Sequence, residues 1–484
     1  MNPETSFVQL QRQLSGHVLF ASDPAYGDAV EIDNGRIHLQ PLCVVQVNST
    51  EDVALCLRFA AQNGLRLTVK GGGHSATGYS LNAGGMVIDM SLLKAISLDL
   101  EHKVLTVQMG LRWSEVYTYL QDTGTGLIPI GGGCSSVGLA GFIQGGGYSF
   151  VSRSYGMSAD NVRSATLVLA DGSVRTVGID SSGEDGELFW ALRGGGGGNW
   201  GVVVSMDIDV HPPKSDKMFT AKLRFAADRA QQVIGFYNKW VETLPDAMAI
   251  YGIWGNSPDP ARPDQSISTF GFTVIYNGHY ADGASLLQPL LALGPLTCAI
   301  DALTLPEFEL INGSSTQVEG RSGYIRAGVM PPEAFSPAAI AVFEKYMACA
   351  PSKDSFLVWT HAGGHISKPA ADATAFVHRG GRFIPELKAM WDTPGQARAN
   401  IEWAHAFFDA LAPHFCGNYV NYIDPLLANW TAQYYGANYA RLLRVKQAVD
   451  PVNVFRFQQS VGSDFEPGLA TPLDLAPLNR TFID

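Results

Sequence analysis

The sequence predicts an α+β protein in which two or three lobes pack closely together. Its 484 residues exceed what one hydrophobic core ordinarily holds, and 46% of them are hydrophobic against 16% charged. The first 210 residues mix short strands and helices with runs of glycine, whereas residues 215–410 alternate strands and amphipathic helices without such runs. We therefore expect a globular chain that is ordered nearly from end to end.

Charge and hydropathy exclude two classes of partner. The formal net charge is −12, and no cluster of Lys and Arg could neutralise a run of phosphates, so we expect no nucleic-acid partner. The segment Met1–Phe7 lacks a basic and apolar leader, and no segment approaches the ~18 apolar residues of a membrane span. These features predict a cytoplasmic protein that does not bind membranes. We expect it to be a monomer or a homodimer.

The cysteines indicate neither a disulfide framework nor a metal site. They are scattered, with no C-x-x-C pair and no His at ligand spacing. Five of them stand in apolar surroundings, where a free thiol usually serves as a small buried hydrophobe: Cys43, Cys56, Cys298, Cys349 and Cys416. Cys134 is the exception, because it directly follows a run of three glycines.

Residues 43–70 predict a strand, a helix and a second strand. The apolar run at 43–47 is followed by Ser49, a helix cap, and Asn63-Gly64 ends the helix. Leu67 and Val69 then alternate with polar residues, as expected of a half-buried strand. This strand leads directly into Gly71-Gly72-Gly73-His74.

The later elements follow from similar patterns. Strands are expected at 86–90 and 104–109, a helix at 113–120, and a hairpin whose two-residue turn is Asp171-Gly172. Pro212-Pro213 marks a boundary. Beyond it we expect strands at 270–275 and 356–359 and helices at 227–244 and 333–349.

The glycine runs match no standard nucleotide motif. The chain has no G-x-x-x-x-G-K-[ST], and no G-x-G-x-x-G opens a helix straight after a strand. Each run alone is most often an ordinary loop. Together the runs at 71–73, 131–133 and 194–198 favour a backbone pressed along an extended flat ligand.

His74 and Cys134 each allow two interpretations. Taken alone, His74 is most often a satisfied or exposed histidine, and Cys134 a buried structural thiol. Each nevertheless follows three glycines, whose missing side chains would clear space for a ring system beside a nucleophile. Imidazole nitrogen and thiolate are both able to add to the electron-poor edge of an oxidised flavin.

These motifs resemble a known family. The segments at 70–78, 131–141, 145–148 and 155–161, with 418–461 near the end, look like the berberine bridge enzyme-like branch of the FAD-linked oxidases, within the vanillyl-alcohol oxidase superfamily. The resemblance implies covalent FAD, held by His74 at the flavin 8α carbon and by Cys134 at C6. It implies a PCMH-type FAD-binding lobe of two subdomains, and a substrate lobe whose antiparallel sheet, backed by helices, roofs the flavin.

On this resemblance we expect three regions: an FAD-binding domain at 1–211 with its core at 38–210, a substrate-binding domain at 212–415, and a C-terminal segment at 416–484 that returns to the FAD lobe. The residues expected to hold the cofactor beside His74 and Cys134 are Lys70, Gly71, Gly72, Gly73, Ser75, Gly78, Gly133, Val137, Gly138, Gly141, Gly145, Asn161, Val203 and Asn438.

Tyr422 is the candidate general base. It matches the Tyr of the family's Asn-Tyr-x-Asp motif, although a packed core tyrosine is the competing interpretation. A free phenol has a pKa near ~10, so neighbouring groups must lower it. Tyr148 either lines the flavin pocket or only packs. Val137 matches the position that in family members controls oxygen access to the flavin, and valine resembles the residue type that admits oxygen. Phe142 departs from the family, because many plant relatives have His at this position.

The resemblance predicts an oxidase that takes hydride from an alcohol, a hemiacetal or a natural product, with O2 as acceptor and H2O2 as product. An oxidative cyclase of secondary metabolism and a flavin-binding protein with little turnover remain alternatives. In the middle region His361, His378 and Arg379 could reach the site, but residues on a strand alternate faces, so each has no more than an even chance.

Overall fold

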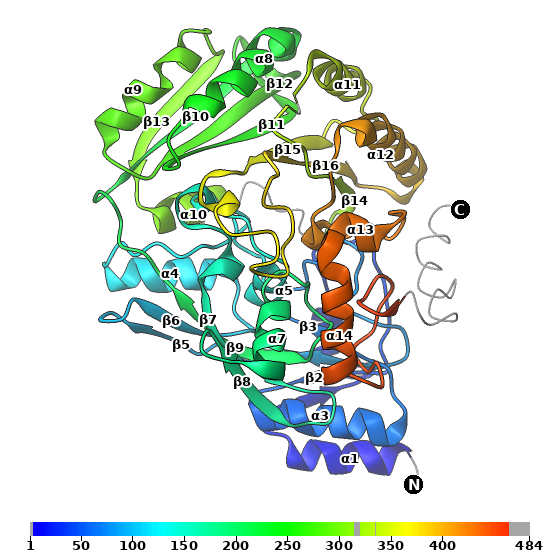
Figure 1. Cartoon of the computed structure of the whole chain (residues 1–484). Coiled ribbons are helices and arrows are strands. Elements are labelled where there is room, and N and C mark those ends of the chain that lie inside the picture. The colour runs from blue at the N-terminus through cyan, green and yellow to red at the C-terminus, as the bar shows by residue number, and fades with distance from the viewer. Residues whose placement is uncertain (1–2, 314–319, 334, 464–484) are drawn as a thin grey trace.

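The computed structural model describes residues 3–313, 320–333 and 335–463, and it has two lobes (Figure 1). The first lobe holds a four-stranded and a five-stranded sheet, and the second lobe holds a seven-stranded sheet. The segment from 418 onward returns from the second lobe to the first. Residues 464–484 of the predicted C-terminal segment lie outside the described residues.

The four-stranded sheet has the order β1-β2-β4-β3, in which β1 is antiparallel to β2 and the other pairs are parallel. Ser49 caps α3 by accepting a hydrogen bond from the Asp52 backbone, and Gly64 ends it in the left-handed conformation, as predicted. The elements are α1 (Pro3–Gln13), β1 (His17–Leu19), α2 (Tyr26–Val30), β2 (Cys43–Gln46), α3 (Thr50–Asn63), β3 (Leu67–Lys70) and β4 (Met86–Asp89).

The five-stranded sheet is antiparallel, with the order β5-β6-β9-β7-β8. The hairpin predicted around Asp171-Gly172 is confirmed, because β7 and β8 pair across that turn. The elements are β5 (Ile96–Asp99), β6 (Val104–Gln108), α4 (Trp113–Thr123), α5 (Leu139–Gln144), α6 (Ser152–Tyr155), β7 (Val162–Val168), β8 (Val174–Gly178), α7 (Gly183–Leu192) and β9 (Val202–Asp209).

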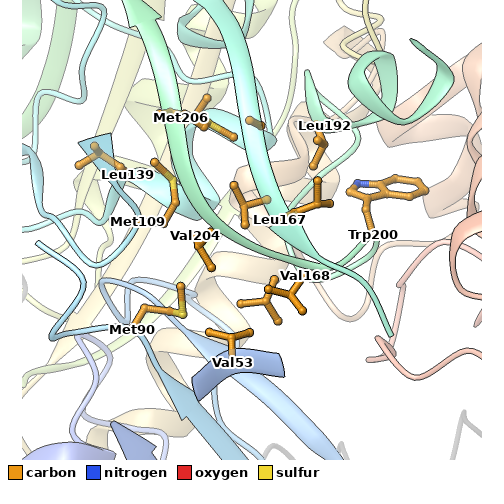
Figure 2. Packing of buried hydrophobic residues seen from close by; sticks show 14 of the residues in the cluster. Val53, Met90, Met109, Leu139, Leu167, Val168, Leu192, Trp200, Val204 and Met206 are labelled. Carbon is orange, nitrogen blue, oxygen red and sulfur yellow. The ribbon is translucent and has the colours of Figure 1, made fainter. Parts of the chain in front are cut away.

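One hydrophobic core joins both sheets of the first lobe (Figure 2). Val53 enters it from α3, Leu139 from α5 and Val204 from β9, and Trp200 is fully buried beside them. Burying each such side chain stabilises the fold by about 1.5–3 kcal/mol. The loops that follow β3 and α4 therefore start from a rigid base.

The second lobe is an antiparallel sheet of order β13-β10-β12-β11-β15-β16-β14, and helices cover its outer face (Figure 1), which confirms the predicted fold class. Its elements are β10 (Met218–Ala226), α8 (Ala230–Trp240), β11 (Met248–Asp259), β12 (Arg262–Tyr276), α9 (Tyr280–Leu291), β13 (Thr297–Leu303), α10 (Leu305–Gly313), β14 (Ser322–Ala327), α11 (Pro337–Ala348), β15 (Phe356–His361), β16 (Phe383–Trp391) and α12 (Ala397–Leu411). The helices α13 (Trp430–Tyr435) and α14 (Tyr439–Val449) follow, and α14 packs on α7.

Two sequence predictions need correction. The helix expected at 333–349 begins only at Pro337, because Ser336 caps it and a residue before proline disfavours helical backbone; residue 334 lies outside the described residues. Cys298, Cys349 and Cys416 are exposed rather than buried, although Cys43 and Cys56 are buried as expected. Cys298 lies on β13, an edge strand whose first five residues face solvent.

No helix in the described part of the chain is both long and apolar enough to cross a membrane.

Candidate active site

The two predicted attachment loops touch each other backbone to backbone. A side chain on Gly72 would place its Cβ 2.3 Å from the Gly138 backbone nitrogen, so only glycine permits this approach. Gly73 has a φ of +73°, which turns the chain between the contact and His74. The loop after β3 and the loop after α4 are thereby held together.

His74 and Cys134 meet around one residue, Ser136. The His74 imidazole is within hydrogen-bond reach of the Ser136 backbone, and the Cys134 Sγ lies 3.4 Å from the Ser136 Oγ. Both nucleophiles remain partly accessible, with the His74 side chain 18% exposed. Burial lowers the pKa of His74, although Asp33 acts in the opposite direction, so the ring is neutral and nucleophilic near neutral pH.

The three glycines before Cys134 do not clear space for a ring system. The spaces where their side chains would lie are filled by the protein itself: Trp113 and Tyr117 at Gly131, Phe142 at Gly132, and Phe150 at Gly133. These glycines instead allow the loop to lie close against aromatic rings. The sequence interpretation of this run was wrong because spacing alone cannot say what fills the space beside a glycine.

A bare strip of backbone lies elsewhere in the first lobe. A Cβ on Gly141 would meet no atom within 4 Å, and a Cβ on Gly197 would lie 3.5 Å from the Gly141 Cα. These two glycines come from α5 and from the run at 194–198, so separate segments form one strip of backbone, and the side chain nearest to the Gly197 position is that of Gln144, at 3.7 Å. Such a strip, with an accessible imidazole and thiol nearby, fits a large flat cofactor such as FAD.

Three predicted cofactor residues have their side chains engaged inside the protein. The Lys70 Nζ donates to the Ala29 carbonyl, Asn161 donates to Tyr155 and Met157 and is 2.7 Å from His211, and Asn438 donates to carbonyls of residues 371–375. They support the backbone of other segments, at residues 29, 155–157 and 371–375. The other predicted residues lie in these loops or in β9 beneath them: Gly71, Ser75, Gly78, Val137, Gly145 and Val203.

Tyr422 is held between the lobes by the two polar residues of its motif. Asn421 donates to the Phe142 carbonyl and packs on Gly145, which ties it to the first lobe. Asp424 accepts hydrogen bonds from Arg326 at 2.8 Å and Tyr324 at 3.3 Å, which ties it to β14. The position of Tyr422 is therefore fixed relative to both lobes.

The carboxylate beside Tyr422 was not predicted from the sequence. Residues 384, 386 and 388 of β16 share the face toward the first lobe, because Ile384 packs in the cluster that contains Tyr148 and Tyr419. The Tyr422 hydroxyl lies within hydrogen-bond reach of Glu386, and the Lys388 Nζ is 3.3 Å from that carboxylate. The signal available in the sequence was the pair of charged residues Glu386 and Lys388, two positions apart in an otherwise apolar strand.

The electrostatics at Tyr422 differ from the sequence expectation. Burial raises the pKa of Tyr422 well above its ordinary value, and Glu386 raises it further. Burial alone would lower the pKa of Lys388, but Glu386, Cys134 and Asp33 together raise it. Near neutral pH the phenol therefore keeps its proton and Lys388 stays charged.

The remaining candidates have other contacts, although Tyr148 belongs to the hydrophobic cluster against which Tyr422 packs. Tyr148 packs edge-on against Phe376 and Tyr419, and its hydroxyl has no hydrogen-bond partner among the described residues. His361 points to the helix-covered face of the sheet, where it stacks on Phe383. Arg379 forms a buried two-pronged ion pair with Asp160 of the first lobe. His378 is within hydrogen-bond reach of backbone groups at 418, 433 and 434.

Comparisons with known proteins agree with this architecture. Residues 41–178 match the model of the FAD binding domain, and residues 418–462 match the model described as berberine and berberine like. The FAD-linked oxidoreductase YgaK of Bacillus subtilis is 30% identical, over 93% of this chain and 97% of its own length. The chain belongs to the berberine bridge enzyme-like FAD-linked oxidoreductases.

Other proteins of this family are also similar to this chain over most of its length. The reticuline oxidase of Eschscholzia californica is 26% identical over 87% of this chain and 83% of its own length. The structure of Physcomitrella patens BBE-like 1 superimposes with a TM-score of 0.85 at 24% identity, covering 94% of this chain and 98% of that one. Both lobes thus have the family fold, and the protein is an FAD-dependent oxidoreductase.

Proposed function

We propose that this protein is an oxidase whose FAD is bonded covalently to both His74 and Cys134. The observation that carries the proposal is the meeting of the two side chains around Ser136, on loops that touch at Gly72 and Gly138. A neutral imidazole and a partly accessible thiol are suitable nucleophiles for the edge of one flavin ring. The bare strip at Gly141 would face the rest of the cofactor.

We assign the proton transfer to Tyr422 and Glu386 acting together. Bound FAD supplies the hydride acceptor. The phenol of Tyr422 keeps its own proton, so it can accept the substrate hydroxyl proton only while passing its own to Glu386. The Lys388 Nζ lies 3.3 Å from the carboxylate that receives this proton.

The substrate in this proposal is an alcohol, a hemiacetal or a hydroxylated natural product, since each has an O–H beside the carbon that loses hydride. Dioxygen is the proposed acceptor and hydrogen peroxide the product. Val137 supports this part, because it stands at the position that the family uses to admit oxygen. It lies partly exposed in the Cys134 loop, where its carbonyl accepts the Trp113 N–H.

An oxidative cyclase is the second candidate, in which the same loss of hydride to the flavin would lead the substrate to close a ring. A panel of sugars, benzylic alcohols and polyketides, mixed first without and then with oxygen, tests both. Flavin bleaching followed by peroxide and a simple carbonyl product supports the oxidase. A ring-closed product supports the cyclase, and no bleaching with any donor would contradict both.

A further inference from the structure

An acidic side chain contacts the imidazole that we assign to FAD attachment. The Asp33 Oδ2 lies 3.7 Å from the His74 Nδ1, and the two side chains are only 16% and 18% exposed. The other charged groups that act on His74 are Arg112 and Lys388, and both are cations. Asp33 is therefore the one carboxylate among the charged groups that act on this ring within the described part of the chain.

The backbone holds Asp33 in place from both sides. Its N–H donates to the Gly73 carbonyl at 3.1 Å, in the residue just before His74, and its carbonyl accepts the Gly320 N–H at 3.1 Å. The neighbouring Asn34 donates to the carbonyls of Ala76 and Gly323. This segment joins the His74 loop to the second lobe, so the carboxylate has little freedom to leave the imidazole.

We propose that Asp33 is the positioning residue for FAD attachment at His74, where its carboxylate orients the imidazole and accepts the ring proton that attachment releases. The proposal rests on the proposed function, because it requires the His74 bond. That bond joins a ring nitrogen to the flavin 8α carbon. One hydrogen leaves the imidazole and one leaves the flavin methyl, and their two electrons and two protons convert dioxygen to hydrogen peroxide.

Asp33 serves this step because an imidazole that forms a new bond through its unprotonated nitrogen carries positive charge until the proton on its other nitrogen leaves. A fixed carboxylate in contact with the ring stabilises that charge and takes the proton. The structure gives Cys134 a different neighbour, since its Sγ is 3.4 Å from the Ser136 hydroxyl. Loss of the Asp33 charge should therefore slow the histidyl bond and leave the cysteinyl bond unaffected.

Two single-attachment parents separate these effects. In Cys134→Ala only His74 can bond to FAD, and in His74→Ala only Cys134 can. Asp33→Asn, which keeps the shape of the side chain, is added to each, and apoprotein from riboflavin-limited cells is mixed with FAD in air. Acid-stable flavin and intact mass are followed with time, and fluorescence quenching gives the affinity before any bond forms.

Asp33→Asn should slow attachment ~10²-fold in the Cys134→Ala parent. It should leave the rate in the His74→Ala parent and both initial affinities unchanged, and Asp33→Glu should restore part of the lost rate. An unchanged rate in the Cys134→Ala parent would overturn the proposal. Equal slowing in both parents, or lost initial affinity, would show a merely structural role and overturn it too. A Cys134→Ala parent that never bonds FAD would instead refute the proposed His74 bond, and the role of Asp33 with it.

Discussion

Removing the acceptor of the proposed proton relay tests the mechanism most sharply. Glu386→Gln keeps the size of the side chain but cannot take a proton from Tyr422, and Tyr422→Phe removes the phenol itself. Each change should slow flavin reduction by substrate ~10²–10⁴-fold, the usual contribution of general-base catalysis. At 1.36 kcal/mol per tenfold change, this is about 3–5 kcal/mol of lost transition-state stabilisation.

The double variant carries the decisive information. If one proton passes through both groups, either single change already stops the relay, and the double variant should be within ~10-fold of the slower single variant. Independent contributions would instead multiply, which would make the double variant ~10⁴–10⁸-fold slower than the parent. Glu386→Asp keeps the charge beside Lys388 and should recover part of the rate.

The assay is anaerobic stopped-flow mixing at saturating substrate, with flavin absorbance as the signal. Each variant is also denatured and its flavin content is measured, so that a slow rate is not mistaken for lost cofactor. Tyr237→Phe is the matched control, because its buried hydroxyl donates to the Ile250 carbonyl on the opposite side of the same sheet. An undiminished rate in Glu386→Gln, or multiplied effects in the double variant, would refute the relay.

Three further predictions concern oxygen, attachment and stability. Val137→Leu should slow reoxidation by dioxygen at least ~10-fold, equal to ~1.4 kcal/mol, while anaerobic reduction stays unchanged; equal reoxidation rates would remove Val137 from oxygen access. His74→Ala and Cys134→Ala should each leave flavin on precipitated protein, and only the double variant should release it; release from a single variant would contradict two bonds. Burial lowers the pKa of His378 from 6.5 to about 4, so the unfolded chain binds an extra proton between these values, and stability should fall by about 3 kcal/mol as the pH drops from 6.5 to 4. Urea unfolding of His378→Gln should lose this part of the pH dependence, and an unchanged slope would contradict it.

Local signals predicted local structure well. Ser49 and Gly64 delimit α3, and Asp171-Gly172 forms the turn between β7 and β8, because these conformations depend on a few adjacent residues. Alternation was less informative for the strand at β3. Thr68 is buried and Val69 is only partly buried there, since a strand in a parallel sheet is covered on both faces.

The candidate site could be predicted only in part. His74, Cys134 and Tyr422 stand in recognisable motifs, and the structure gathers the first two around Ser136. Asp33 and Glu386 stand in no such motif, because each reaches the site through contacts between distant segments.

The sequence also could not predict toward which face of the sheet a strand residue points. Nothing in the sequence says whether His361 or Glu386 points toward the first lobe, since neighbouring strands and covering helices decide it.

The mass and visible spectrum of the denatured intact protein give the sharpest test of covalent FAD attachment. After expression with ample riboflavin, we expect a yellow polypeptide that is heavier by one FAD and keeps its colour through acid precipitation. A colourless chain with the mass of its amino acids alone would contradict covalent attachment at His74 and Cys134.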